Sequence, residues 1–206
     1  KEKGQGRFVQ DGSTVANAWK GYIGREAIPK YKNPARGFVS SANQNYTDPS
    51  YPYYYNSEEF DGYRGRAVNR RLAENNAFTV NDMMLMQNDN FSVWADDALP
   101  PMFANIDEAA LSATEKAILD ELKGWNRYFD AEKIAPVYFN EWWNEFYNAT
   151  FDEILEQQKA YAILRPRKWR LIEILQKEPQ NKFFDKKSTA DKIETAKDVL
   201  TATFKT

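Results

Sequence analysis

Two polar residues, Asn43 and Arg64, are the best candidates for chemistry in this chain. Asn43 directly follows residues 37–42, whose apolar and small residues predict a short strand. An asparagine amide can donate hydrogen bonds to a developing oxyanion without titrating, and an arginine can hold a carboxylate or a carbonyl in fixed geometry. Arg66 is the second choice for the arginine. None of these side chains is a nucleophile, so the chemistry needs a further group, which this chain need not contain.

The chain has no histidine and no cysteine. A Ser-His-Asp triad, a cysteine nucleophile, a disulfide and the usual zinc site are therefore excluded within these residues. A general base would have to be a carboxylate, a lysine, a tyrosine or an α-amino group. The net charge of −2 gives no field that would attract nucleic acid or an anionic membrane, and no apolar run approaches the roughly 18 residues of a membrane span. We expect neither partner.

The elements that must position these residues change in character near residue 56. Residues 1–56 are rich in glycine, lysine and turn residues, and we expect loops with short strands at 7–10, 19–23 and 37–42. Residues 57–206 are predicted to be mostly helical, in about six helices. The predicted fold class is α+β, and the whole range 1–206 is predicted to be a single fragment. Because the chain opens on Lys1 and ends inside a helical pattern, we expect a piece of a larger polypeptide.

Helix starts are predicted from capping patterns. A helix should begin at Thr79, another at the capping box Ser112–Glu115, and a third with Pro136 in its first turn. The last two should begin near Pro166 and at residues 188–191, with Ile193 on the buried face of the final helix. An aromatic stripe at helical spacing is predicted to be core: Phe139, Trp142, Trp143, Phe146 and Tyr147.

An ordered series of motifs in the first half of the chain resembles one protein family. In chain order they are Asn33-Pro34, Gly37, Ser41-Ala42-Asn43-Gln44, Tyr51-Pro52, Tyr63-Arg64 and Gln87-Asn88-Asp89. Their order and spacing are similar to those in the C-terminal part of the β chain of the penicillin acylase family of N-terminal nucleophile hydrolases. The specific resemblance covers roughly residues 12–103. The remainder is similar only as a helical continuation.

The resemblance implies an amide hydrolase with a larger αββα fold. In that family the nucleophile is a Ser, Thr or Cys exposed by self-cleavage of a precursor, and its own α-amino group is the base. Lys1 cannot play that role, so the nucleophile would lie outside this chain, and the fragment alone would be inactive. Asn43 matches the family's oxyanion-hole asparagine, and Arg64 matches the arginine that orients the site. The implied partners are the α chain, the rest of the β chain and a small N-acyl amide, in the periplasm or outside the cell.

The chain departs from the family pattern at a structural calcium site. Many members bind this ion through acidic residues, one of which lies between the Tyr-Pro motif and the arginine. Here the comparable position falls at Tyr54, Tyr55 or Asn56, which weakens the case for a structural calcium without excluding it. No cofactor is expected to be required for the chemistry itself.

Less specific interpretations stand beside these. Asn43 could be a simple turn residue after a strand, and Arg64 and Arg66 could lie on a solvated helix face. The whole chain could also be a noncatalytic module that binds a glycan or a peptide through its many aromatic residues. Where Tyr51 to Tyr55 lie, buried or exposed, separates the module from the hydrolase.

Overall fold

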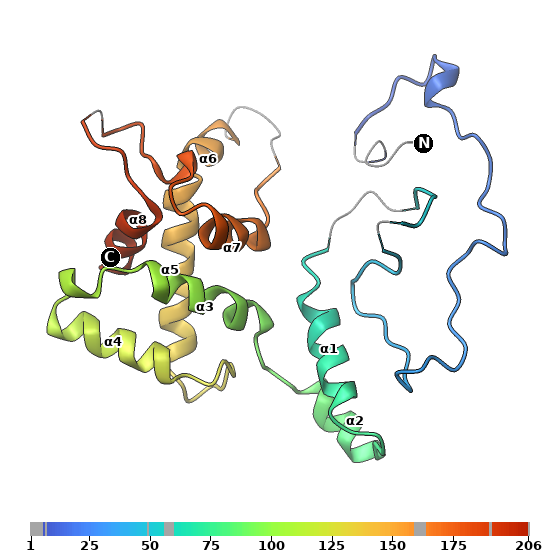
Figure 1. The fold of residues 1–206 in the computed structure, drawn as a ribbon, viewed down its shortest axis with the longest axis horizontal. Coiled ribbons are helices and arrows are strands. Elements are labelled where there is room, and N and C mark those ends of the chain that lie inside the picture. The colour runs from blue at the N-terminus through green and yellow to red at the C-terminus, as the bar shows by residue number, and fades with distance from the viewer. Residues whose placement is uncertain are drawn as a thin grey trace. The chain divides into compact units, whose positions relative to one another are not determined.

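The computed structural model describes residues 6, 8–48, 50–55, 60–158, 164–189 and 191–205. The chain divides into two compact units, Lys1–Gln87 and Asn88–Thr206. Figure 1 labels the α-helices of both units. Among the described residues, no helix is long and apolar enough to cross a membrane.

The first unit is a long irregular segment followed by two helices. Figure 1 shows the irregular part in blue to cyan; it includes the short 3₁₀ turn η2 (Val15–Asn17). The helices are α1 (Tyr63–Ala73) and α2 (Val80–Gln87). Side chains tie distant parts of the irregular segment together. The Tyr51 hydroxyl donates to the Ala27 carbonyl at 2.9 Å, and the Tyr31 hydroxyl donates to the Tyr46 carbonyl at 3.1 Å.

The structure does not confirm the three short strands predicted in this unit. None of the described residues within 7–10, 19–23 and 37–42 is in a strand, and Arg7 lies outside the described residues. An extended segment forms a strand only when a neighbouring segment supplies ladder hydrogen bonds, and the described residues supply none here. Gly37 also has a φ of 78°, which is not a strand conformation. The α+β class is therefore seen only in its helical part.

The second unit is helical. Its α-helices are α3 (Val93–Asn105), α4 (Ala113–Gly124), α5 (Ala135–Thr150), α6 (Asp152–Gln158), α7 (Lys168–Lys177) and α8 (Ala196–Phe204), with short 3₁₀ turns η3 (Glu108–Ala110) and η4 (Lys182–Phe184). Helix α5 packs against α4, α6 and α8, while α3 packs against α7 and α8. An isolated antiparallel bridge joins Phe91 to Tyr128.

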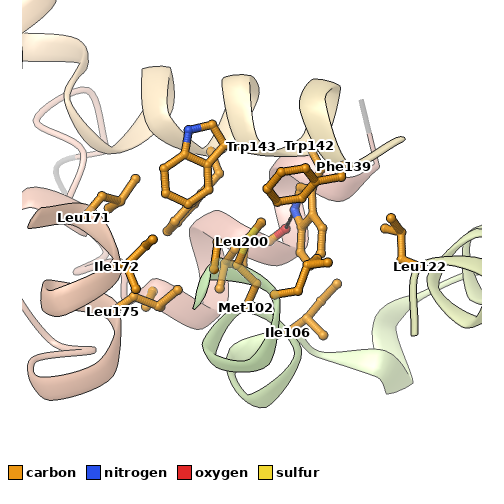
Figure 2. Close-up of a cluster of buried hydrophobic side chains, with 14 of the residues drawn as sticks. Met102, Ile106, Leu122, Phe139, Trp142, Trp143, Leu171, Ile172, Leu175 and Leu200 are labelled. Carbon is orange, nitrogen blue, oxygen red and sulfur yellow. Dashed lines mark hydrogen bonds between the residues drawn. The ribbon is translucent and has the colours of Figure 1, made fainter. Parts of the chain in front are cut away.

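The core of the second unit confirms the predicted aromatic stripe. Phe139, Trp142, Trp143 and Phe146 are buried, and Tyr147 is half-buried. In Figure 2 the first three point from α5 toward side chains of other helices, among them Met102, Leu171 and Leu200. The buried Trp142 indole donates to the Leu200 carbonyl at 3.2 Å, so its one polar atom has a partner inside the core.

Most predicted helix starts are confirmed. Helix α4 begins with a reciprocal capping box between Ser112 and Glu115, and Pro136 lies in the first turn of α5. The Thr79 hydroxyl accepts from the Asp82 backbone amide at 3.2 Å at the start of α2. Helix α7 begins at Lys168, close to Pro166 as predicted.

The start of the last helix was predicted wrongly. Helix α8 begins at Ala196 after a capping box between Thr195 and Asp198, not at residues 188–191. The Thr189 hydroxyl instead donates to the Lys186 carbonyl at 2.9 Å and contacts the Glu194 carboxylate, which builds a turn. Ile193, predicted to face the core, is 80% exposed because it precedes the helix.

Candidate functional site

Asn43 stands where the backbone turns sharply. Its φ is 51°, in the left-handed region that asparagine tolerates better than most residues. The side chain is exposed. Asn43 is therefore a turn residue. This backbone geometry is compatible with both interpretations of Asn43 from the sequence, a simple turn role and a catalytic role.

Arg64 lies in the first turn of α1. The helix begins there because Gly62, with a φ of 72°, supplies a left-handed N-cap that a residue with a side chain adopts only under strain. From this position Arg64 Nη1 donates to Asn43 Oδ1 at 2.5 Å. The structure thus joins the two predicted site residues across 21 positions of sequence.

The contact fixes the orientation of the Asn43 amide. A guanidinium has only donors, so the amide atom that faces Arg64 must be the carbonyl oxygen. The Nδ2 group, with two N–H donors, is then turned away from Arg64. Among the described residues Nδ2 has no hydrogen-bond partner. Its donors remain available to a ligand.

Both residues line an open concavity of about 510 Å³ within the first unit. The lining residues are Ser41, Ala42, Asn43, Gln44, Tyr46, Tyr55, Phe60 and Arg64. Arg64 carries the one formal charge among them, and the Ser41 and Tyr46 hydroxyls are 3.0 Å apart. The concavity therefore combines a cation and an oriented amide with hydroxyl groups and an aromatic wall, a combination suited to a polar substrate that develops negative charge.

Comparison with known proteins decides the family. A sequence profile described as penicillin amidase matches residues 1–206. The chain belongs to the penicillin amidase family. It is also 30% identical over 122 residues to the penicillin acylase 2 proenzyme of Pseudomonas sp. (strain SE83). That match covers 59% of this chain and 16% of the length of the relative. The resemblance read from the ordered motifs is confirmed.

The second-choice arginine of this penicillin amidase chain, Arg66, does not join the pair. It lies on α1 two residues after Arg64, and positions i and i+2 of a helix face different directions. It is exposed and does not line the concavity. Arg64 is therefore the arginine that meets Asn43.

Gly65 and Asn69, which contact Gln44 next to Asn43, were not identified from the sequence. Gly65 is buried, and a Cβ added there would lie 3.1 Å from Gln44 Cβ and closer still to the Gln44 amide oxygen. Asn69, one helical turn later, also contacts Gln44 through its side chain. The motif Tyr63-Arg64 gave no hint of these contacts, but the small residue next to Arg64 on a helix was an available signal of close packing.

Two of the three residues comparable to the family's calcium ligand, Tyr54 and Tyr55, offer no carboxylate in this penicillin amidase chain. The Tyr54 hydroxyl accepts from the Gly6 amide at 3.1 Å, and the Tyr55 hydroxyl accepts from the Tyr46 amide at 3.1 Å. Neutral hydroxyls engaged in this way are poor substitutes for calcium-binding carboxylates. Asn56 lies outside the described residues. Within the described part of the chain, no group of three or more His, Cys, Asp or Glu side chains could hold a metal ion.

The loop tyrosines contact one another. The Tyr51 ring meets those of Tyr53 and Tyr55 edge to face, with centroids 5.6 and 5.8 Å apart. Tyr51 is half-buried, whereas Tyr53 and Tyr55 are 46% and 42% exposed. The exposure of Tyr53 and Tyr55 is what the binding-module interpretation expects, whereas their edge-to-face packing on Tyr51 braces the loop.

Proposed function

We propose that this chain is part of a self-processing amidohydrolase of the penicillin acylase type, which cleaves an N-acyl amide bond. The observation that carries the proposal is the hydrogen bond from Arg64 to Asn43, two residues that line the open concavity. Family membership supports the reaction class. The reaction would be acyl transfer to an N-terminal hydroxyl or thiol, followed by hydrolysis of the acyl-enzyme.

Asn43 is proposed to stabilise the oxyanion. With its carbonyl oxygen held by Arg64, the amide can direct Nδ2–H toward the negative oxygen of the tetrahedral intermediate. A fixed donor of this kind contributes about 3 to 4 kcal/mol to lowering the barrier, because it is already oriented when the charge develops. The Asn43 amide is neutral throughout, so its contribution does not depend on pH.

Arg64 is proposed to act by orientation. Its guanidinium offers only N–H donors and cannot accept a hydrogen bond, so it selects one rotamer of the Asn43 amide. Its positive charge also lies near the place where the oxyanion forms. Both effects favour the transition state over the neutral ground state of the amide.

The remaining machinery is proposed to come from outside this chain. An N-terminal Ser, Thr or Cys would attack the carbonyl, its α-amino group would serve as base, and a backbone amide would supply a second oxyanion donor. The α chain and the rest of the β chain of the same precursor are the proposed partners, with a linear or β-lactam-linked N-acyl amide as substrate. Export to the periplasm or the medium is proposed on family resemblance alone. Calcium has no part in the proposal.

The test is the denatured intact mass and N-terminal sequence of the full-length protein that contains this chain. We expect two polypeptides. The one that contains Asn43 and Arg64 should begin with Ser, Thr or Cys, and replacing that first residue by alanine should leave the precursor uncleaved. One unprocessed chain in a folded and soluble protein would overturn the self-processing mechanism.

A further inference from the structure

We propose that Asn69 is the positioning residue that sets the geometry of the Asn43–Arg64 pair. The inference rests on the proposed function for its kinetic consequence, but not for its structural one. Asn69 does not itself line the concavity, and its side-chain hydrogen bonds within the described residues go to residues other than Asn43 and Arg64. It would act by fixing the segment that carries Asn43 onto the helix that carries Arg64.

Both ends of the Asn69 side-chain amide form hydrogen bonds. Its Nδ2 donates to the Gly65 carbonyl at 2.7 Å and to Gln44 Oε1 at 3.4 Å. Its Oδ1 accepts from Ser40 Oγ at 2.8 Å and from Arg36 Nη1 at 3.0 Å. An asparagine amide offers two donors and two acceptor sites, so these four bonds fill its capacity. A half-buried surface residue with every site occupied is built for a fixed arrangement.

Three of the four residues that bond to Asn69 lie close in sequence to Asn43 or Arg64. Ser40 precedes Asn43 by three residues, and Gln44 follows it directly. Gln44 Nε2 donates back to the Ser40 carbonyl at 3.5 Å, which closes the turn around Asn43. In helix α1, Gly65 directly follows Arg64, and its backbone carbonyl accepts the hydrogen bond from Asn69 Nδ2. Asn69 therefore bonds to the immediate neighbours of both members of the pair.

The pair needs such support because it is exposed. Asn43 and Arg64 are both in contact with solvent, where water competes for each hydrogen bond and a long arginine side chain has many rotamers. A fixed separation of the two backbones removes most of those alternatives. The absence of a side chain at Gly65 lets the segment approach α1 closely enough for the bonds to form.

The competing explanation is that Asn69 only stabilises its own helix. Asn105 of α3 provides the matched control, because its Nδ2 donates to the Pro101 carbonyl at 2.9 Å, the same bond from residue i to i−4. Asn105 belongs to the second unit, whereas the site segment belongs to the first. If the local bond were the whole role, Asn69→Ala and Asn105→Ala would have the same effects.

The first experiment compares crystal structures of the full-length protein with and without Asn69→Ala. We expect the variant to lose the bond between Arg64 Nη1 and Asn43 Oδ1, with residues 40–44 displaced, and Asn105→Ala to retain it. A variant that keeps Asn43 and Arg64 at hydrogen-bond distance overturns the inference whatever its activity. Should Asn69→Ala fail to fold, Ser40→Ala removes one of the four bonds and is expected to displace the same residues to a smaller extent.

The second experiment measures kcat and KM on acetyl, phenylacetyl, glutaryl and octanoyl 4-nitroanilides. We expect Asn69→Ala to lower kcat about tenfold or more with little change in KM, because it disturbs transition-state contacts and not binding. In an Asn43→Ala background the same substitution should lower kcat no further, and an additive loss overturns the inference. A wild-type protein that is processed but cleaves no anilide would count against the proposed function, while the crystal structures would still decide the role of Asn69.

Discussion

Arg64 Nη1 lies 2.5 Å from Asn43 Oδ1, and this contact orients a neutral amide beside an open concavity. The pair joins the start of a helix to a left-handed turn 21 residues earlier. Both backbone features depend on residues suited to positive φ, since Gly62 begins the helix and Asn43 itself makes the turn. The chemistry proposed for this chain follows from that one geometry.

Removing Arg64 should impair turnover and not stability. Arg64 is exposed, so Arg64→Ala should change the free energy of unfolding by no more than about 0.5 kcal/mol. Loss of amide orientation should lower kcat on an acyl nitroanilide by about 10- to 100-fold. Arg66→Ala removes the same charge from the same helix and is the control, with kcat expected within about twofold of wild type. Equal activity of the two variants would contradict the role of Arg64.

Gly65→Ala should disturb the site without unfolding the protein. The new methyl group would meet Gln44, so Gln44 and the turn that carries Asn43 must shift. The gain in helix propensity, about 1 kcal/mol, should offset much of the cost of this shift. We expect kcat to fall severalfold. Gly124→Ala, where the added Cβ meets nothing within 4 Å, should leave kcat unchanged.

Phe139→Ala should strongly destabilise the second unit. Phe139 is fully buried and its ring lies 4.7 Å from that of Trp94, so truncation opens a large cavity. We expect a loss of about 3 to 5 kcal/mol in the free energy of unfolding, measured by urea denaturation of the full-length protein. Val137→Ala, on the same helix but 50% exposed, should cost less than about 1 kcal/mol. Similar losses for both would contradict the packing of α5.

Asp198 should make the start of α8 sensitive to acid. The Lys192 ammonium, followed by the Thr195 hydroxyl, lowers the pKa of Asp198 from 3.8 to about 2. A carboxylate with a lowered pKa stabilises the folded state above its unfolded pKa, and that contribution is lost as the pH falls from about 4 toward 2. Asp198→Ala should therefore cost about 1 kcal/mol at pH 7. The difference from wild type should shrink below pH 4, and a difference that grows in acid would contradict the assignment.

The sequence predicted those features that short-range codes determine. The capping box of Ser112 and Glu115 spans four residues, and the α5 stripe repeats at helical spacing, so both follow from local geometry. Asn43 and Arg64 were chosen as site candidates from the order of the family motifs. Periodicity alone could not have paired residues 21 positions apart.

Features that depend on distant partners were not predictable in this way. Residues 37–42 have the composition of a strand, but a strand also requires a neighbouring segment, and none of the described residues provides one. Two similar capping patterns precede α8. The one at residues 188–191 does not begin the helix, because the Thr189 hydroxyl bonds to Glu194 instead. The role of Asn69 depends on contacts with residues up to 33 positions away, which no local pattern specifies.

The most direct test of the account is the kcat of Asn43 variants in the processed full-length enzyme. Asn43→Ala removes the amide, while Asn43→Asp keeps an acceptor for Arg64 but loses both N–H donors. Asn45→Ala, an exposed asparagine that does not line the concavity, is the control. The account predicts that both Asn43 variants are processed and folded with kcat lowered by about 10²–10³, and that Asn45→Ala is unaffected. Wild-type turnover in Asn43→Ala would remove Asn43 from the mechanism and contradict the account.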